Sequence, residues 1–426
     1  MILVGVIFFG LLALGMPVGF ILGVAGVVGI LDMGGGRFLT MVPDRFFAGL
    51  DLFPFLAMPF FILAGEIMNK TGITDQIVKF ADSLVGWLRG GMAHTNFAAS
   101  IMFAGITGAA TAEAAAFGNT LVPAMVKSGY TKPFSCAVVA AGSIIGPTIP
   151  PSTLMIIYGS IMGVSIAGMF AAGILPGLLI GAACMGMIAI FGKRWNLPKS
   201  DRRPSLRLIA TTFRGSFLAL LLPVFILGSI LGGWATPTEA AAIAVAYALF
   251  LGAAVYRKLS WPDLYHTLVR TTMITGVIFV IIASATILGW WMTYNQIPQL
   301  IAKGFLSISS NPAVIIGMIV VLLLFIGLFM DINATLIIMA PVLGPLTLAI
   351  GMDPIHAGIV IVLALNISLM TPPVGACLFV LASVCKEKIE NITRSLWPFI
   401  LAEVTVLLLV AYWPAVTLSV PRALGF

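Results

Sequence analysis

The chain consists of eleven apolar stretches separated by short polar gaps, and this pattern constrains its fold more than any other feature. A membrane span needs about 20 apolar residues. Only 9% of the residues are charged, whereas a soluble domain carries about 25%. So few polar groups cannot build a water-facing surface, so we predict an all-α polytopic membrane protein. The stretches cover residues 1–30, 53–69, 95–127, 134–158, 165–192, 214–232, 236–256, 271–295, 312–349, 355–381 and 396–415.

Several other classes of protein are disfavoured. The first stretch has no basic segment and no cleavage site, so we expect a retained first helix, not a signal peptide. The net charge of +7 comes from short loops, which indicates membrane topology and not nucleic-acid binding. The sequence has no phosphate-binding glycine loop, so we do not expect this chain to hydrolyse ATP itself. The four cysteines and three histidines lack metal-ligand spacing, so we predict no enzyme activity and no cofactor.

Two of the stretches, 95–127 and 312–349, are too long for one span. Each is interrupted near its middle by small or polar residues, at 105–111 and at 331–335. Such a break indicates a re-entrant hairpin that enters and leaves the membrane by one face. Its irregular backbone is tolerated only where protein or a water-filled cavity covers it.

The two halves of the chain match each other. At an offset of 222 positions prolines and glycines coincide, and further upstream the offset is 224. This is an internal repeat of about 180 residues. The coinciding pairs are Pro123 with Pro345, Gly129 with Gly351, Pro150 with Pro372, Pro151 with Pro373, Pro176 with Pro398, Gly65 with Gly289, Met68 with Met292, Ile73 with Ile297 and Ile77 with Ile301.

The basic residues indicate that the repeats are inverted. If the N-terminus is cytoplasmic and both long stretches are hairpins, 18 of the 22 basic residues are cytoplasmic. We therefore predict nine full spans, two hairpins that enter from opposite faces, and an external C-terminus. Inverted repeats with discontinuous helices are typical of transporters. Residues 71–91 are amphipathic and are expected to lie along the membrane surface, with a weaker counterpart at 296–310. The four external basic residues are Arg37, Arg45, Lys303 and Arg422.

Each hairpin is followed by a stretch with two adjacent prolines, at 146–152 and at 366–375. Proline removes a backbone donor and clashes with the preceding turn. We expect each span to unwind here and to offer carbonyl and hydroxyl oxygens to Na⁺, while half-helix N-termini attract an anion. The alternative is a simple proline kink with small residues for helix packing. The hydroxyls are those of Thr148, Ser152, Ser368 and Thr371.

Acidic residues inside a membrane are costly and mostly functional. Asp331 lies in the second break beside Asn333 and Thr335, and Glu113 lies just past the first. Both are candidates for ion binding, with capping of a hairpin tip as the alternative. Glu239 follows a proline and is expected to stabilise a helix start.

In this order, Gly-Pro-x-x-Pro-Pro-Ser, Thr-Pro-Thr-Glu-Ala, Asp-Ile-Asn-Ala-Thr and Thr-Pro-Pro-Val-Gly resemble the large membrane subunit of tripartite ATP-independent periplasmic (TRAP) transporters. The resemblance covers essentially the whole chain. It implies the ion transporter superfamily's elevator-type fold, Na⁺ coupling and import of an organic acid into a bacterium across its inner membrane. It also implies two partners, a small four-helix membrane subunit and a periplasmic binding protein. We expect the small subunit to be a separate chain. A stand-alone anion/sodium symporter of the same superfamily is the alternative.

The resemblance divides the chain and assigns site residues. It implies scaffold and arm at 1–94 and 236–310, transport-domain halves at 95–164 and 311–385, connecting helices and a basic loop at 165–235, and a C-terminal helix at 386–426. The family's first tip often carries a serine where this chain has Ala109. The predicted substrate-binding residues are Thr107, Gly108, Pro150, Ser152, Asn333 and Thr371. The predicted Na⁺ ligands are Gly108, Thr111, Gly146, Thr148, Asp331, Asn333, Ser368 and Thr371.

Overall fold

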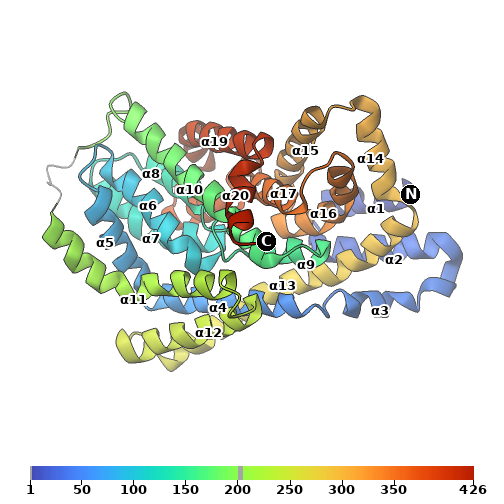
Figure 1. Cartoon of the computed structure of the whole chain (residues 1–426), viewed down its shortest axis with the longest axis horizontal. Helices are drawn as coiled ribbons and strands as arrows, with labels where there is room; N and C mark the ends of the chain where they lie inside the picture. Colours follow the sequence, from blue (N-terminus) through green and yellow to red (C-terminus); the bar gives the residue numbers. More distant parts are fainter. Residues whose placement is uncertain (1, 200–204) are drawn as a thin grey trace.

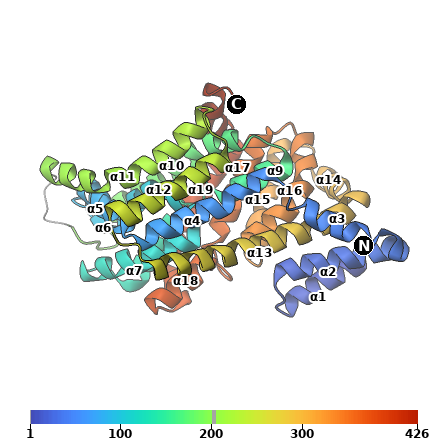
Figure 2. The same ribbon diagram turned by 90° about the horizontal axis from the view of Figure 1, so that it is seen from below.

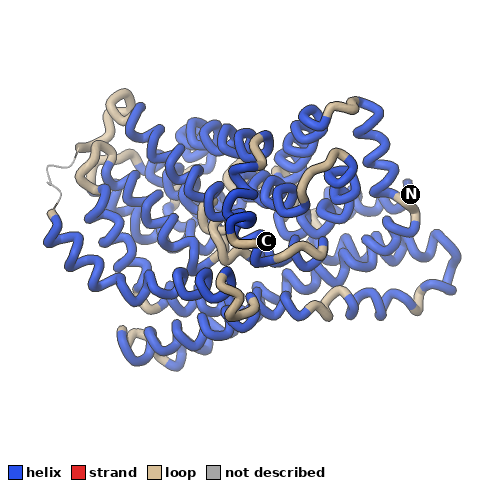
Figure 3. Tube along the Cα trace, viewed as in Figure 1, coloured by secondary structure: helices blue, strands red, loops and turns tan. Residues whose placement is uncertain are grey.

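The protein is described by a computed structural model that covers residues 2–199 and 205–426, without the side chains at 34, 35, 106 and 107. The described residues form helices and connecting loops, with no β-strand (Figure 3). Figure 1 labels the helices. The α-helices are α1 (Ile2–Ala13), α2 (Val18–Gly34), α3 (Met41–Ala48), α4 (Ala57–Lys70), α5 (Ile73–Val85), α6 (Gly91–Thr107), α7 (Ala110–Lys127), α8 (Lys132–Ser143), α9 (Thr153–Met162), α10 (Ile166–Phe191), α11 (Leu206–Leu231), α12 (Pro237–Phe250), α13 (Trp261–Tyr294), α14 (Ile297–Ile308), α15 (Pro312–Gly327), α16 (Ile332–Ala349), α17 (Pro354–Ser368), α18 (Ala376–Cys385), α19 (Ile389–Tyr412) and α20 (Ala415–Ala423).

The internal repeat is visible in the order of the helices. Helices α4 to α10 have the same sequence of lengths and breaks as the second part of α13 followed by α14 to α19. The scaffold helices pack across the two repeats: α2 of the first repeat lies along α13 of the second, and α12 of the second lies along α4 of the first. Inside the molecule α7 packs against α18 and α16 against α9. The internal repeat predicted from the glycine and proline pattern is therefore present in the fold.

The expectation of a single first helix is wrong. Residues 1–30 contain two helices, α1 and α2, which pack against each other (Figure 2). Gly15 between them has a φ of +75°, and Pro17 follows two residues later. A left-handed glycine ends a helix, and proline cannot continue the preceding one.

The number of spans also differs from the predicted nine. Among the described residues seven helices are long and apolar enough to cross a membrane, or eight if α3 and α4, which bend by 57°, form one span. Six of the seven coincide with predicted spans, and the seventh is α16, an arm of the second hairpin. The predicted spans at 1–30 and 355–381 are missing because each is divided into shorter helices by a proline-containing break, and 53–69 belongs to the bent pair of α3 and α4. The predicted orientation, with a cytoplasmic N-terminus, remains a prediction.

Both predicted hairpins are present. Helices α6 and α7 meet at Gly108, whose φ is +55°, and Ala109, which is extended. Helices α15 and α16 meet at a short turn that ends at Asp331. The partners in each pair pack against each other. The polar breaks seen in the sequence are thus the tips of two helical hairpins.

The spans after the hairpins are broken where the paired prolines predicted. Helix α8 ends at Ser143 and α9 begins at Thr153, and α17 and α18 are separated by residues 369–375. Both proline pairs contain a cis peptide bond, Pro150–Pro151 and Pro372–Pro373. The first non-helical stretch, 144–152, is buried throughout, which satisfies the condition for irregular backbone at membrane depth. The second is only partly covered, because Pro373 and Val374 are exposed.

The two amphipathic segments form α5 and α14. In α5 the side chains of Ile73, Ile77 and Phe80 are buried, and the helix packs against α6 and α11. Each of the two helices connects a scaffold helix, α4 or α13, to the first helix of a hairpin. Their position along the membrane surface remains a prediction.

Candidate functional site

A cavity of about 420 Å³ lies where the two hairpin tips meet the scaffold. We call it the tip cavity. Its wall includes Gly108 to Ala112 from the first tip and Asp331 to Asn333 from the second. Helices α4 and α13 close the opposite side, and Pro147 and Leu369 come from the two unwound stretches. Segments more than 200 positions apart in the sequence therefore form one site.

One ion pair in this cavity was not predicted from the sequence. Arg270 of α13 lies with its Nε 3.4 Å from Oε1 of Glu66 on α4. The Glu66 side chain is 8% exposed and that of Arg270 is 55% exposed, so the arginine reaches the cavity from its open side. The only sequence signal was the presence of Glu66 inside an apolar stretch, because the pairing itself depends on the tertiary fold.

Asp331 caps the N-terminus of α16. Its Oδ1 accepts hydrogen bonds from the backbone N–H of Asn333, at 2.9 Å, and of Ala334, at 3.3 Å. The side chain also lines the tip cavity. The structure thus shows the capping role that was weighed as the alternative to ion binding. The other carboxylate oxygen, Oδ2, makes neither of these bonds, and the exposed side chain remains open to the cavity.

A hydrogen bond joins the first unwound stretch to the C-terminal end of α17, just before the second unwound stretch. The side-chain amide of Asn366 donates to the hydroxyl of Thr148 at 3.1 Å, and both residues are fully buried. The hydroxyl of Thr148 itself donates to the carbonyl of Ile144 at 2.8 Å. The Oδ1 of Asn366 has no hydrogen-bond partner among the described residues. These two side chains can therefore still offer oxygen lone pairs, together with the second N–H of the Asn366 amide.

The other predicted hydroxyls are arranged similarly. Ser368 donates to the carbonyl of Leu365 at 2.6 Å, and Thr371 donates to that of Ile367 at 2.8 Å. Ser152 is fully buried, and its hydroxyl has no partner within the described part of the chain. Hydroxyls that direct their protons to helix carbonyls leave their oxygens available to a cation.

The predicted site residues fall into two groups. Gly108, Thr111, Asp331 and Asn333 line the tip cavity. The rest lie in the unwound stretches, and these residues do not line it: Gly146, Thr148, Pro150, Ser152, Ser368 and Thr371. The groups are adjacent at the first tip, because a Cβ at Gly108 would collide with the carbonyl of Pro151. The side chain of Thr107 lies outside the described residues.

Glu113 lies behind the first tip. It is fully buried, and neither carboxylate oxygen has a hydrogen-bond partner among the described residues. Its Oε2 lies against the unwound stretch, 2.5 Å from where a Cβ of Gly146 would be. Glu403 on α19 is also fully buried, with Oε1 3.9 Å from the Sγ of Cys184. An isolated buried carboxylate is costly, so Glu113 must hold a proton or a cation.

Glu239 confirms the structural role predicted for it. Its carboxylate accepts a hydrogen bond from the backbone N–H of Thr236 at 2.8 Å, and its own N–H donates to the Thr236 hydroxyl at 3.3 Å. This reciprocal pair is a capping box at the start of α12.

Two inverted repeats, each with a hairpin and a broken helix that converge on one cavity, define a membrane transporter. Comparison with protein families agrees with this class, since the family described as "Tripartite ATP-independent periplasmic transporter, DctM component" matches residues 5–416. The chain belongs to this TRAP large-subunit family. It is accordingly a multi-pass protein of the inner membrane, and its homologues are transporter permeases and not enzymes.

Named relatives support this assignment. The chain is 39% identical to the sialic acid TRAP transporter large permease protein SiaM of Vibrio cholerae, over 99% of this chain and 98% of that one. It is 34% identical to the C4-dicarboxylate TRAP transporter large permease protein DctM of the same organism, over 97% and 96%. The similar identities to permeases for different acids do not point to one substrate.

A solved structure supports the fold. The YdaH transporter of Alcanivorax borkumensis superimposes with a TM-score of 0.62 over 91% of this chain and 90% of that one. The sequence identity is 18%, so the likeness concerns the fold alone.

Proposed function

We propose that this chain is the permease through which an organic acid is imported with Na⁺, after delivery by a periplasmic binding protein. The observation that carries the proposal is the tip cavity, where both hairpin tips and both broken helices meet beside Arg270. Relatives named for sialic acid and for C4-dicarboxylates support a carboxylated substrate.

The substrate would bind in the tip cavity. A volume of about 420 Å³ accommodates a small organic acid. The start of α7 lines the cavity without a side-chain cap, and an open helix N-terminus attracts anions. The N-terminus of α16 is already capped by Asp331. The guanidinium of Arg270 has its Nε beside Glu66, and its remaining N–H groups can bind a carboxylate of the substrate. Asn333 adds an amide that can bond to polar substituents of the acid.

Sodium would bind behind the tips. No nucleotide-binding loop is present in the sequence, so uphill import needs an ion gradient. Glu113 offers two carboxylate oxygens without partners among the described residues, beside the backbone of Gly146. In the second repeat Asn366 and Thr371 offer neutral oxygens next to an unwound stretch. Such oxygen ligands suit a hard, weakly charged cation.

Transport would proceed by an elevator movement. Helices α2, α4, α12 and α13 pack across the two repeats and would form the stationary scaffold. Direct contacts join the hairpins and the broken helices, with α7 against α8 and α18 and with α9 against α16, and these elements would move as one body. In the structure both hairpin tips lie beside Glu66 and Arg270. This is the end of the scaffold that the basic residues predict to be cytoplasmic.

Reconstitution into proteoliposomes tests the proposal. The chain is assembled with its small membrane subunit and its binding protein, and uptake of radiolabelled sialic acid and succinate is measured. We expect uptake of an acid that the binding protein binds, and none when either partner is omitted. Equal uptake by this chain alone would favour the stand-alone symporter instead. Lack of uptake of every acid that the binding protein binds would contradict both.

A further inference from the structure

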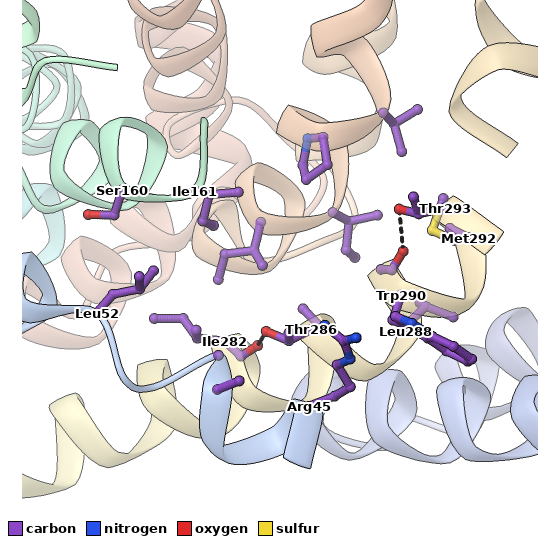
Figure 4. A pocket seen from close by; sticks show the side chains of 18 of the residues that line it. Arg45, Leu52, Ser160, Ile161, Ile282, Thr286, Leu288, Trp290, Met292 and Thr293 are labelled. Carbon is purple, nitrogen blue, oxygen red and sulfur yellow. Dashed lines mark hydrogen bonds between the residues drawn. The ribbon is translucent and has the colours of Figure 1, made fainter. Parts of the chain in front are cut away.

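A second cavity, of about 510 Å³, lies at the other end of the scaffold (Figure 4). We call it the outer cavity, because the distribution of basic residues predicts that this end of the scaffold is external. It is formed by α3, the C-terminal half of α13 and the start of α14, and it is closed by α9 and α16. Of the described residues that line it, Arg45 alone is charged. Neither the sequence motifs nor the named relatives assign a role to it.

The outer cavity is the inverted-repeat copy of the tip cavity. Four lining residues on α4 correspond to four lining residues on α13 at the offset of 224 positions that relates the scaffold helices. These equivalent residues all lie on the scaffold helices α4 and α13, so the correspondence does not depend on the positions of the hairpin tips. The pairs are Ile62 with Thr286, Gly65 with Gly289, Glu66 with Trp290, and Asn69 with Thr293.

Each cavity also carries one arginine at a related position. Arg45 and Arg270 are 225 positions apart, one more than the offset of the scaffold helices. The extra position falls where the first scaffold helix is broken between α3 and α4, whereas α13 is continuous. Arg45 is thus the counterpart of Arg270.

The partners of the two arginines differ in charge. Arg270 lies beside the carboxylate of Glu66. At the position equivalent to Glu66 the second repeat has Trp290, and the guanidinium carbon of Arg45 lies 5.9 Å from the centre of that ring. An aromatic ring orients an arginine without neutralising it. Among the described residues no carboxylate lies within 4.0 Å of Arg45.

The two cavities therefore have opposite formal charge. The tip cavity is lined by Arg270, Glu66 and Asp331, which sum to −1. Among the described residues that line the outer cavity, Arg45 is the charged one, which gives +1. We propose that the outer cavity is a carboxylate-binding site centred on Arg45, and that it captures the acid on the external side.

The chemistry of the lining fits an organic acid with a polar body. Arg45 can bind a carboxylate through two parallel hydrogen bonds. Ser160 lines the same cavity, and its buried hydroxyl has no partner among the described residues. In Figure 4 Ser160 and Arg45 lie far apart on different sides of the cavity, and the Ser160 hydroxyl is directed away from Arg45. The hydroxyls of Thr286 and Thr293 donate to helix carbonyls and remain acceptors for hydroxyl groups of the ligand.

The inference rests on the proposed function, because it requires that an organic acid is transported. The charge difference does not set the direction of transport, which the gradients determine. It sets the apparent affinity on each side. An external site with an unneutralised arginine lowers the KM for uptake, and an internal site in which Glu66 competes for Arg270 releases the acid more readily.

Sided transport measurements test the role of Arg45. Uptake from outside and exchange from the inside are measured for Arg45→Gln, Arg45→Lys and Arg270→Gln in the complete reconstituted complex, with the acid that wild type transports. We expect Arg45→Gln to raise the external KM about tenfold or more, since a hydrogen bond to a charged group is lost. Its internal KM should stay within about twofold of wild type. Arg45→Lys should recover part of the external affinity, and Arg270→Gln should mainly change the internal KM.

Introducing a negative charge at Trp290, the position equivalent to Glu66, provides the matched control. Trp290→Glu gives the outer cavity the ion pair of the tip cavity, and Trp290→Gln removes the ring without adding charge. We expect Trp290→Glu to raise the external KM clearly more than Trp290→Gln does. An external KM unchanged in Arg45→Gln, or equal effects of the two Trp290 variants, would overturn the inference while wild-type uptake leaves the proposed function intact. Absence of wild-type uptake would instead contradict the proposed function.

Discussion

The side-chain amide of Asn366, in the last turn of α17, donates a hydrogen bond to the hydroxyl of Thr148 in the first unwound stretch, and this contact joins the two inverted repeats. The residues are 218 positions apart and both are fully buried. Each stretch follows a hairpin whose tip lines the tip cavity. A change in either stretch is therefore transmitted to the other through a direct polar contact.

This contact should be measurable as a coupling between the two repeats. We expect Thr148→Val and Asn366→Leu each to lower the thermal stability of the purified complex, because each leaves a buried polar partner unsatisfied, at a cost of about 1–3 kcal/mol. The double variant should be less destabilised than the sum of the single ones. Thermal unfolding followed by fluorescence, with all three variants compared, measures the coupling. Strict additivity would show that the contact does not join the repeats.

Gly108 should tolerate no side chain. Its φ is +55°, and an added Cβ would collide with the carbonyl of Pro151. Gly163 is the matched control, because its φ is +67° and nothing lies within 4 Å of an added Cβ. Both alanine variants carry a backbone cost of about 1–2 kcal/mol, but only Gly108→Ala displaces the first tip. We expect Gly108→Ala to lose most uptake per assembled complex and Gly163→Ala to keep it. Similar activities of the two would contradict the placement of the tip.

Asp331 allows the capping and ion-binding roles to be separated. Asparagine retains the N-cap but removes the charge, and alanine removes both. If Asp331 is a Na⁺ ligand, Asp331→Asn and Asp331→Ala both shift the Na⁺ dependence of uptake to higher concentration, and Asp331→Ala loses most transport while remaining inserted and bound to its small subunit.

The measurement is uptake as a function of Na⁺ concentration, normalised to assembled complex. A wild-type Na⁺ curve for Asp331→Asn, with a loss of stability of about 0.5–2 kcal/mol in Asp331→Ala, would identify the residue as a cap alone.

Substitutions at Glu113 and at Glu239 should affect uptake differently, although both residues lie in the first turn of a helix. Glu113 is buried without a partner among the described residues, so Glu113→Gln removes the charge that a coupling cation requires. We expect this variant to lose most Na⁺-driven uptake without a large loss of assembly. Glu239→Gln retains much of the capping box and serves as the control, with near wild-type uptake. Equal Na⁺ dependence of Glu113→Gln and wild type would remove Glu113 from the ion site.

Much of the fold was predictable because its breaks are local. Glycine and proline act on the backbone within one or two residues, so Gly108, the Pro150 and Pro372 pairs and the repeat offset could all be read from the sequence. The same signals, Gly15 and Pro17, were present in the first stretch, but continuous hydrophobicity favoured one helix there. Apolar composition shows how much chain lies in the membrane and not where it turns.

The site was less predictable because it depends on distant pairings. Glu66 and Arg270 are 204 positions apart, and the positive-inside rule assigned the arginine to topology and not to a cavity. Asp331 was recognised as a tip residue, but its hydrogen bonds to Asn333 and Ala334 follow from the geometry of the turn. Charge partners of buried residues are set by helix packing, which hydropathy does not record.

The central claim, Na⁺-driven import through the tip cavity, is tested most directly by the ion requirement of uptake. The complete complex is reconstituted in proteoliposomes, and accumulation of the labelled acid is followed with an inward Na⁺ gradient or with a proton gradient in Na⁺-free buffer. We predict uphill accumulation only with the Na⁺ gradient. Undiminished accumulation in Na⁺-free buffer with the proton gradient alone would contradict the claim.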